Sequence, residues 1–146
     1  MTQKLFSIAY FPPIDYLLEM KTADTVLVEA HENYQKQSYR NRATILTGNG
    51  LHDLIIPIVR NSEKQIKEIR IDYSMAWQRN HWKTIESAYN NSPYFLYYRD
   101  FFEPLFQKTV QKSLCNTKNK GYCYMPIQWF SNDCAAKPRY YQCVSL

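Results

Sequence analysis

The sequence predicts an α/β or α+β fold, with a mixed sheet of about five strands that starts with a βαβ unit and has C-terminal helices packed on it. Three observations support this fold. A strand–helix–strand pattern occupies residues 5–29, an Asn-Gly turn joins two apolar runs within residues 43–59, and helical periodicity begins after residue 72. The chain has 146 residues, the length of one domain, and can bury roughly 70% of its unfolded surface.

The βαβ unit comes first. Leu5–Ala9 is a short apolar run typical of a strand, and Pro13 suits the first position of a helix, where a missing amide hydrogen costs nothing. Apolar residues at helical spacing extend that helix to about Thr22. Thr25–Glu29 is rich in β-branched residues and predicts the second strand, parallel to the first.

A long loop and a hairpin follow. Residues 30–42 (AHENYQKQSYRNR) fit no period and predict a polar loop of the kind that often carries function. Ala43–Thr47 and Leu51–Val59 flank Gly48-Asn49-Gly50, which predicts two strands joined by a tight turn. Pro57 indicates that the second of these strands is an edge strand or carries a bulge.

One more strand and several helices complete the predicted domain. Ile66–Ile71 alternates apolar and charged residues, which predicts a half-buried strand. Asp72 or Ser74 is expected to cap a helix that runs to about Asn90.

The next helix is predicted to begin with Ser92 as its cap and Pro93 in its first position. Pro104 is expected to break this helix and to begin a last one. The aromatic residues before the break are expected to pack in the core; they are Tyr94, Phe95, Tyr97, Tyr98, Phe101 and Phe102.

Charge and cysteine separate the body from the tail. Residues 1–111 hold 13 basic and 12 acidic residues, whereas residues 112–146 hold 5 basic and 1 acidic. The four cysteines all lie in the tail, and no two of them have the close spacing of a zinc site. We therefore expect a domain over residues 1–112, an irregular cysteine-rich tail over 113–146, and no metal.

Several partners are not expected. The nearly neutral body argues against a nucleic-acid groove, and no apolar stretch approaches the length of a membrane span. The N-terminus lacks the pattern of a secretory leader, so we expect a cytoplasmic protein without a disulfide framework. No glycine-rich nucleotide loop or hydrolase motif is present, and the cofactor and oligomeric state stay unknown.

The first candidate cluster is YFPPIDY at residues 10–16. It lies between the end of a strand and the start of a helix, where open α/β sheets bind ligands and where free amides attract anions. Pro13 would keep this turn stiff, and Tyr10 and Tyr16 could stack on a sugar or a base. The alternative is a rigid turn with packed tyrosines.

The second cluster lies in the polar loop. Lys36, Arg40 and Arg42 suit a phosphate, and Asn41 could meet a developing oxyanion. His31 has Glu29 and Glu32 as neighbours and could act as a general base oriented by a carboxylate. The alternative is a solvated loop whose charges pair with one another.

The third cluster is WQRNHW at residues 77–82. Trp77 and His81 share a helix face with Ile85, and His81 is a second candidate base. Trp77 and Trp82 could form a platform for a carbohydrate, although all three side chains also suit a core. His52 is interpreted as structural.

Taken together, these clusters resemble the WbqC-like family of bacteria over about residues 5–112. The matching residues keep their order and spacing: Tyr10, Pro12, Pro13, Ile14, Tyr16, Ala23, Asp24, Glu29, His31–Tyr34, Lys36, Gln37, Tyr39–Arg42, Ile45, Asn49, Gly50, Pro57, Ile71, Trp77, His81, Trp82, Ser87–Tyr89, Pro93, Phe95, Tyr97, Tyr98, Asp100, Phe102 and Pro104. The YQKQxYRNR string is the most specific part.

The resemblance implies a role in O-antigen or capsule biosynthesis, as an acyl or aminoacyl (glycine) transferase acting on a nucleotide-linked amino sugar. The alternatives are a non-catalytic protein that binds a nucleotide sugar or carbohydrate, and a nucleotidyltransferase-like enzyme. The expected partner is a nucleotide sugar or another phosphorylated small molecule. Beyond residue 112 the sequence departs from the family pattern, and we expect the tail to be a shifted reading frame or a truncation.

Overall fold

The computed structural model describes residues 2–29, 31–59 and 64–107, and the backbone of residues 115–116, 122–123 and 140–144. Its elements follow the order β1 (Gln3–Phe6), α1 (Ile14–Lys21), β2 (Thr25–Glu29), β3 (Arg42–Thr47), β4 (Gly50–Ile55), α2 (Trp77–Tyr89), α3 (Phe95–Gln107), β5 (Cys115–Asn116), β6 (Tyr122–Cys123) and β7 (Tyr140–Val144). The chain mixes helices and strands, as an α+β fold does.

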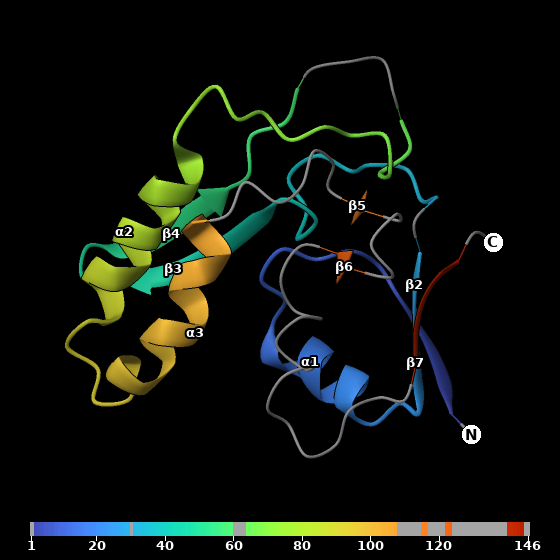
Figure 1. The fold of residues 1–146 in the computed structure, drawn as a ribbon, viewed down its shortest axis with the longest axis horizontal. Helices are drawn as coiled ribbons and strands as arrows, with labels where there is room; N and C mark the ends of the chain where they lie inside the picture. Colours follow the sequence, from blue (N-terminus) through green and yellow to red (C-terminus); the bar gives the residue numbers. More distant parts are fainter. Residues whose placement is uncertain are drawn as a thin grey trace.

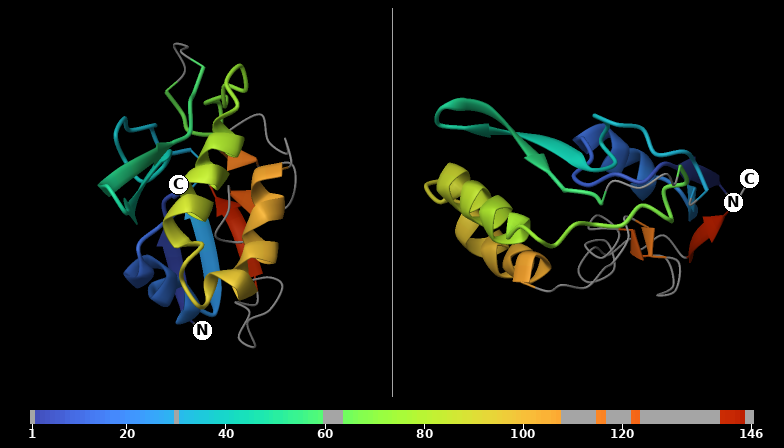
Figure 2. Two further views of the ribbon diagram at one scale, coloured as in Figure 1. Left: turned by 90° about the vertical axis from the view of Figure 1, so that its left-hand side faces the viewer. Right: turned by 90° about the horizontal axis from the view of Figure 1, so that it is seen from above.

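The predicted mixed sheet of about five strands is wrong. The described strands form a parallel sheet in the order β1-β2-β7, the antiparallel hairpin β3-β4, and the short antiparallel pair β5-β6. The hairpin stays apart from the parallel sheet because its apolar face packs on α2, which itself packs on α3 (Figures 1 and 2). Three of these strands lie in the tail, for which no regular element was predicted.

The βαβ unit is confirmed, since β1 and β2 are parallel and α1 connects them. β1 ends at Phe6, before the predicted end at Ala9, because the chain leaves the sheet there and enters the core. Ile8, Ala9 and Tyr10 are buried, and the Tyr10 N–H donates to the carbonyl of Tyr39 over 2.7 Å. This bond ties the turn after β1 to the polar loop.

The hairpin is also confirmed. Thr47 pairs with Gly50 across the turn, and Gly50 has a φ of 106°, a conformation that glycine adopts without a steric cost. β4 ends at Ile55 instead of reaching Val59, because Pro57 has no amide hydrogen for a strand ladder. Beyond it, Ile58 forms only an isolated bridge with Ile71.

The predicted strand Ile66–Ile71 is wrong. The segment forms a turn, with isolated bridges at Gln65 and Ile71. Ile66, Ile69 and Ile71 are all buried, so the alternation of apolar and charged residues marks a loop held to the core by its isoleucines.

α2 starts at Trp77, later than predicted. The carboxylate of Asp72 accepts the Ser74 N–H over 2.8 Å and closes a separate turn instead of capping the helix. The buried face is as predicted, because Trp77, His81 and Ile85 all point into the core.

α3 runs through Pro104, so the predicted break is wrong. Phe106 is buried beyond the proline and its ring centroid lies 5.7 Å from that of Trp82, which holds the last turn against α2. The predicted packing of the aromatic residues holds for Phe95 but not for Tyr94, Tyr97, Tyr98 and Phe101, which are exposed. The last predicted helix extends beyond residue 107, outside the described residues.

Candidate functional site

Two cavities adjoin each other where the turn after β1, the polar loop and β3 come together. The smaller one has a volume of about 580 Å³ and the larger one about 1020 Å³. Gln37 and Arg42 line both cavities, so the two form one bipartite region. Gln37 has a φ of 56°, a left-handed conformation that is uncommon for a residue with a side chain and recurs at ligand sites.

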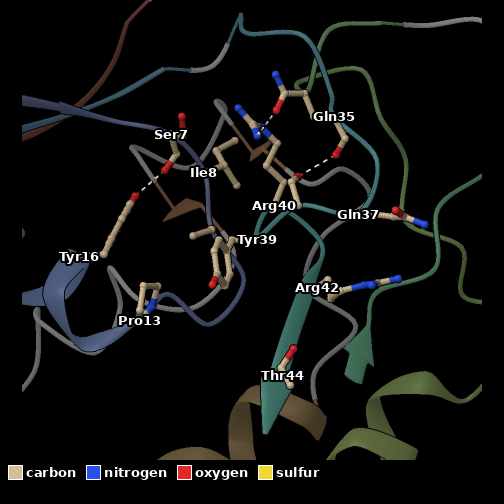
Figure 3. A pocket seen from close by; sticks show the side chains of 12 residues that line it. Ser7, Ile8, Pro13, Tyr16, Gln35, Gln37, Tyr39, Arg40, Arg42 and Thr44 are labelled. Atoms are coloured by element: carbon tan, nitrogen blue, oxygen red, sulfur yellow. Dashed lines mark hydrogen bonds between the residues drawn. The ribbon is translucent and has the colours of Figure 1, made fainter. Parts of the chain in front are cut away.

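The smaller cavity brings the first two sequence clusters together. Pro13 and Tyr16 come from the start of α1, whereas Tyr39, Arg40 and Arg42 come from the loop and the first position of β3 (Figure 3). Tyr16 is held in place because its hydroxyl donates to the carbonyl of Ser7 and its ring lies edge-on to Phe6.

Arg40 and Glu32 form a largely buried ion pair beside this cavity. The Nε of Arg40 donates to one carboxylate oxygen of Glu32 over 3.0 Å, and a terminal nitrogen contacts the other oxygen. The Ser7 hydroxyl donates to that second oxygen as well. The positive charge of Arg40, predicted to hold a phosphate, is therefore compensated by the protein itself.

Arg42 is available to a ligand in a way that Arg40 is not. Its only ion pair among the described residues is with the half-exposed Asp53, at 3.3 Å, and its Nε is buried without a hydrogen-bond partner. A buried N–H without a partner is costly, and a water molecule or a bound group can supply the missing acceptor. In Figure 3 the side chain of Arg42 extends away from Pro13 and Tyr39, on the same side as Gln37.

The larger cavity is cationic. Lys36, Arg42 and Lys64 line it, and no described lining residue is a carboxylate. Tyr34 lies in the same wall, and burial raises the pKa of its phenol while Arg40 and Arg42 oppose the rise. The phenol is neutral at pH 7 and can donate a hydrogen bond.

His31 does not have the carboxylate partner that the sequence predicts. Its ring Nδ1 lies 3.2 Å from the Nζ of Lys67, and Glu29 accepts the backbone N–H of His31 over 2.7 Å. Glu32 is occupied by Arg40. The predicted histidine–carboxylate pair is wrong, because the loop turns each carboxylate toward a different donor.

His81 and Tyr10 are in the core. Tyr10 is 0% exposed and His81 is 6% exposed, and their hydroxyl oxygen and Nδ1 are 2.8 Å apart. Burial lowers the pKa of His81 to about 4, and a hydrogen bond to the Ile55 backbone opposes the shift. His81 is therefore neutral at pH 7, and neither side chain lines a described cavity.

Three more predicted site residues, Trp77, Trp82 and Asn41, are held by contacts within the protein. Trp77 is buried with its ring centroid 5.2 Å from that of His81, and Trp82 stacks on Phe95 at 6.1 Å. Asn41 forms part of the larger cavity's wall, but its side-chain amide donates to the Ile56 carbonyl over 3.0 Å. The contacts of Trp77 and Trp82 match the core alternative that the sequence left open for them, whereas Asn41 belongs to the polar loop and lines the larger cavity.

Sequence reasoning missed three groups at the site. Tyr39 is 60% exposed in the smaller cavity, Lys64 lines the larger one, and Lys67 is the partner of His31. Tyr39 lies within the YQKQxYRNR string, which was a usable signal. The two lysines lie in a segment predicted in part as a strand, and nothing in its pattern indicated a site.

The described part of the chain contains no grouping of histidine, cysteine and acidic side chains able to hold a metal ion. None of its helices is long and apolar enough to cross a membrane.

Residues 9–125 match the WbqC-like protein family. An uncharacterized protein of Mycobacterium tuberculosis is 26% identical over 107 residues, which make up 72% of this chain and 46% of that protein. The chain thus spans less than half the length of this relative. No solved structure matches the chain.

Proposed function

Because this chain belongs to the WbqC-like protein family, we propose that it binds a nucleotide-linked amino sugar and transfers an acyl or aminoacyl group to it in surface-polysaccharide biosynthesis. The larger cavity carries the proposal, since Lys36, Arg42 and Lys64 line it without a described carboxylate. Cations gathered in this way repel one another unless an anion lies among them. A diphosphate supplies that anion.

Arg42 is the proposed main anchor of the diphosphate. A guanidinium binds phosphate oxygens with two parallel hydrogen bonds, and the ion pair with Asp53 leaves most of its donors free. Lys36 and Lys64 are exposed and add charge without fixed geometry. Ile55, Ile58 and Ile69 give the cavity apolar surface, which suits the ring of a sugar.

In the transfer step the amine of the sugar attacks the acyl carbonyl of an activated donor, a C–N bond forms, and the bond from the acyl carbon to its carrier breaks so that the carrier leaves. A group of the protein must accept the proton that the amine loses. Of the two predicted bases, His81 is buried and lines neither cavity, so the proposal does not use it. His31 stays the proposed group. The ammonium of Lys67 donates to its Nδ1, so the ring accepts the proton at that nitrogen once this contact is broken. A nucleotide-linked substrate also makes the cytoplasm the proposed location.

The second candidate function is a non-catalytic protein that binds a nucleotide sugar in the same pathway. One observation favours it: neither histidine lines either of the two adjoining cavities, so far as the described residues define them. The anion-binding proposal is common to both functions, and only turnover separates them.

Calorimetric titration of the full chain with a panel of nucleotide sugars tests the binding. Arg42→Ala is expected to weaken binding roughly tenfold or more, because hydrogen bonds to charged groups contribute about 1.5–3 kcal/mol. Arg79→Ala is the matched control, since Arg79 is exposed on α2 and lines neither cavity. Binding that is insensitive to Arg42 and to salt would contradict the proposal.

Turnover distinguishes the two functions. Mass spectrometry of the amino sugar after incubation with aminoacyl and acyl donors detects transfer. For an enzyme, His31→Ala is expected to abolish product while affinity for the nucleotide sugar is kept. Product formation that does not change in His31→Ala would remove His31 from the proposal, and absence of product with intact binding would favour the non-catalytic function.

A further inference from the structure

We propose that the smaller cavity is a nucleobase subsite in which the base stacks on the ring of Tyr39. This inference rests on the proposed function, because it takes Arg42 as the group that holds the diphosphate. It goes further by assigning the two ends of the ligand: the base lies in the smaller cavity and the sugar in the larger one.

Tyr39 presents a large aromatic surface on a fixed backbone. Its side chain is 60% exposed, and no described residue makes a hydrogen bond or ring contact with it. Its carbonyl accepts the N–H of Tyr10 over 2.7 Å, and the neighbouring Ser38 carbonyl accepts the N–H of Arg42 over 3.2 Å. An exposed aromatic ring on a backbone fixed in this way offers its face to a base for stacking.

The other walls of the smaller cavity fit a flat heterocycle with polar edges. Pro13 contributes a rigid apolar surface near Tyr39, and the buried Ile8 also lines the cavity (Figure 3). Gln35 contributes an amide, a group that can donate and accept hydrogen bonds as the edges of a base require, whereas the Gln37 side chain lies on the side of Arg42 (Figure 3). The carbonyl oxygen of the Gln35 side chain accepts from Arg40, which leaves its NH₂ group as a donor.

The distribution of charge separates the base from the phosphates. Arg40 is compensated by Glu32, so the cation nearest to Tyr39 in sequence offers no free charge. The available guanidinium is that of Arg42, which belongs to both cavities and extends away from Tyr39 (Figure 3). A nucleoside diphosphate therefore spans from an uncharged aromatic surface to a cationic wall, whereas a simple sugar phosphate would use the larger cavity alone.

The test compares pyrophosphate with the diphosphates of uridine, cytidine, adenosine and guanosine by isothermal titration calorimetry. The proteins are the unmodified chain, Tyr39→Ala, Tyr39→Phe, Arg42→Ala and the control Tyr97→Ala, in which another exposed tyrosine, in α3, is removed. Because Tyr39 is tied to Tyr10 through its backbone, the substitution leaves that hydrogen bond in place. Circular dichroism verifies that each variant folds.

At least one nucleoside diphosphate is expected to bind more tightly than pyrophosphate. Tyr39→Ala is expected to weaken that nucleotide roughly tenfold and leave pyrophosphate unchanged, since base stacking on an aromatic side chain is lost. Tyr39→Phe keeps the stacking surface and is expected to keep the affinity. Arg42→Ala is expected to weaken both ligands, and Tyr97→Ala neither.

Two results overturn the inference and leave the proposed function standing. In the first, no nucleoside diphosphate binds better than pyrophosphate. In the second, Tyr39→Ala leaves nucleotide affinity intact while Arg42→Ala weakens both ligands. Equal loss of both ligands in Tyr39→Ala also overturns it. If neither pyrophosphate nor any nucleotide binds, the proposed function fails, and the inference fails with it.

Discussion

The free energy of unfolding is expected to fall as the pH is lowered from 7 to 4, and His81 should account for a defined part of that fall. His81 is 6% exposed, and its Nδ1 is hydrogen-bonded to the Tyr10 hydroxyl. Burial lowers the pKa of its imidazole from 6.5 to about 4, because the charged form loses hydration in the core. The hydrogen bond to the Ile55 backbone offsets only part of this loss.

The sign follows from proton binding in the two states. Between pH 6.5 and pH 4 the unfolded chain binds a proton at His81 and the folded chain does not, so stability falls as the pH falls. The contribution is complete above pH 6.5 and is lost as the pH approaches 4. Since each pKa unit corresponds to about 1.4 kcal/mol, His81 accounts for about 3 kcal/mol over this range.

Urea unfolding, followed by tryptophan fluorescence at pH 7, 6, 5 and 4, measures this contribution in the unmodified chain and in His81→Gln. Glutamine does not titrate, whereas the carboxylates of the two proteins are the same and cancel in the comparison. The unmodified chain is expected to lose about 3 kcal/mol more than the variant. Equal losses would refute the reasoning, and so would an NMR titration that places the pKa of His81 near 6.5.

Three further predictions concern stability at pH 7, measured by urea unfolding. Tyr10→Phe is expected to cost about 1–3 kcal/mol, because it leaves the buried Nδ1 of His81 without its donor. Glu32→Gln is expected to cost about 2–3 kcal/mol, since it removes the charge that compensates the buried Arg40. Ile66→Ala is expected to cost about 2–5 kcal/mol, as Ile66 is 0% exposed and its removal leaves a cavity.

Matched controls separate these effects from those of surface substitutions. Glu19→Gln alters the ion pair that the exposed Glu19 forms with the partly exposed Lys4, and should cost less than about 1 kcal/mol. Leu51→Ala removes an exposed apolar side chain of the hairpin and should change stability by less than about 0.5 kcal/mol. A loss in Glu19→Gln as large as that in Glu32→Gln would contradict the role given to burial.

Local signals in the sequence were sufficient for the βαβ unit and the hairpin. In both, neighbouring segments pair with each other: Thr25–Glu29 lies beside the first strand, and the Asn-Gly turn brings β3 and β4 together. The number of sheets could not be predicted from the sequence, because it depends on whether the hairpin joins β1 and β2 or packs on α2. No periodicity in the sequence distinguishes these two arrangements of the hairpin.

Two errors have a common cause. The alternation in Ile66–Ile71 and the proline at position 104 are local signals that tertiary packing overrides. Three buried isoleucines hold the first segment as a loop, and the packing of Phe106 compensates for the helix hydrogen bond that Pro104 cannot make. The sequence pattern does not show which core residues either segment contacts in the folded protein.

The same limit explains which predicted site residues line the cavities. The sequence shows that His31, Glu32 and Arg40 are close along the chain, but not that Glu32 binds Arg40 and leaves His31 to Lys67. Charged residues in one loop can compensate one another or converge on a ligand. Only the distances between their atoms distinguish the two arrangements.

The register of β3 explains why Arg42 pairs only with the half-exposed Asp53 among the described residues, whereas Arg40 pairs with the largely buried Glu32. Residues of a strand alternate between its faces, so the buried Ala43 places Arg42 and Thr44 together on the opposite face. Both side chains line the smaller cavity (Figure 3). Arg40 precedes the strand, in the turn that brings it within reach of Glu32. A shift of one residue in the pairing of β3 with β4 would turn Arg42 toward the core, so the Asn-Gly turn that sets this register also determines which cation faces the cavities.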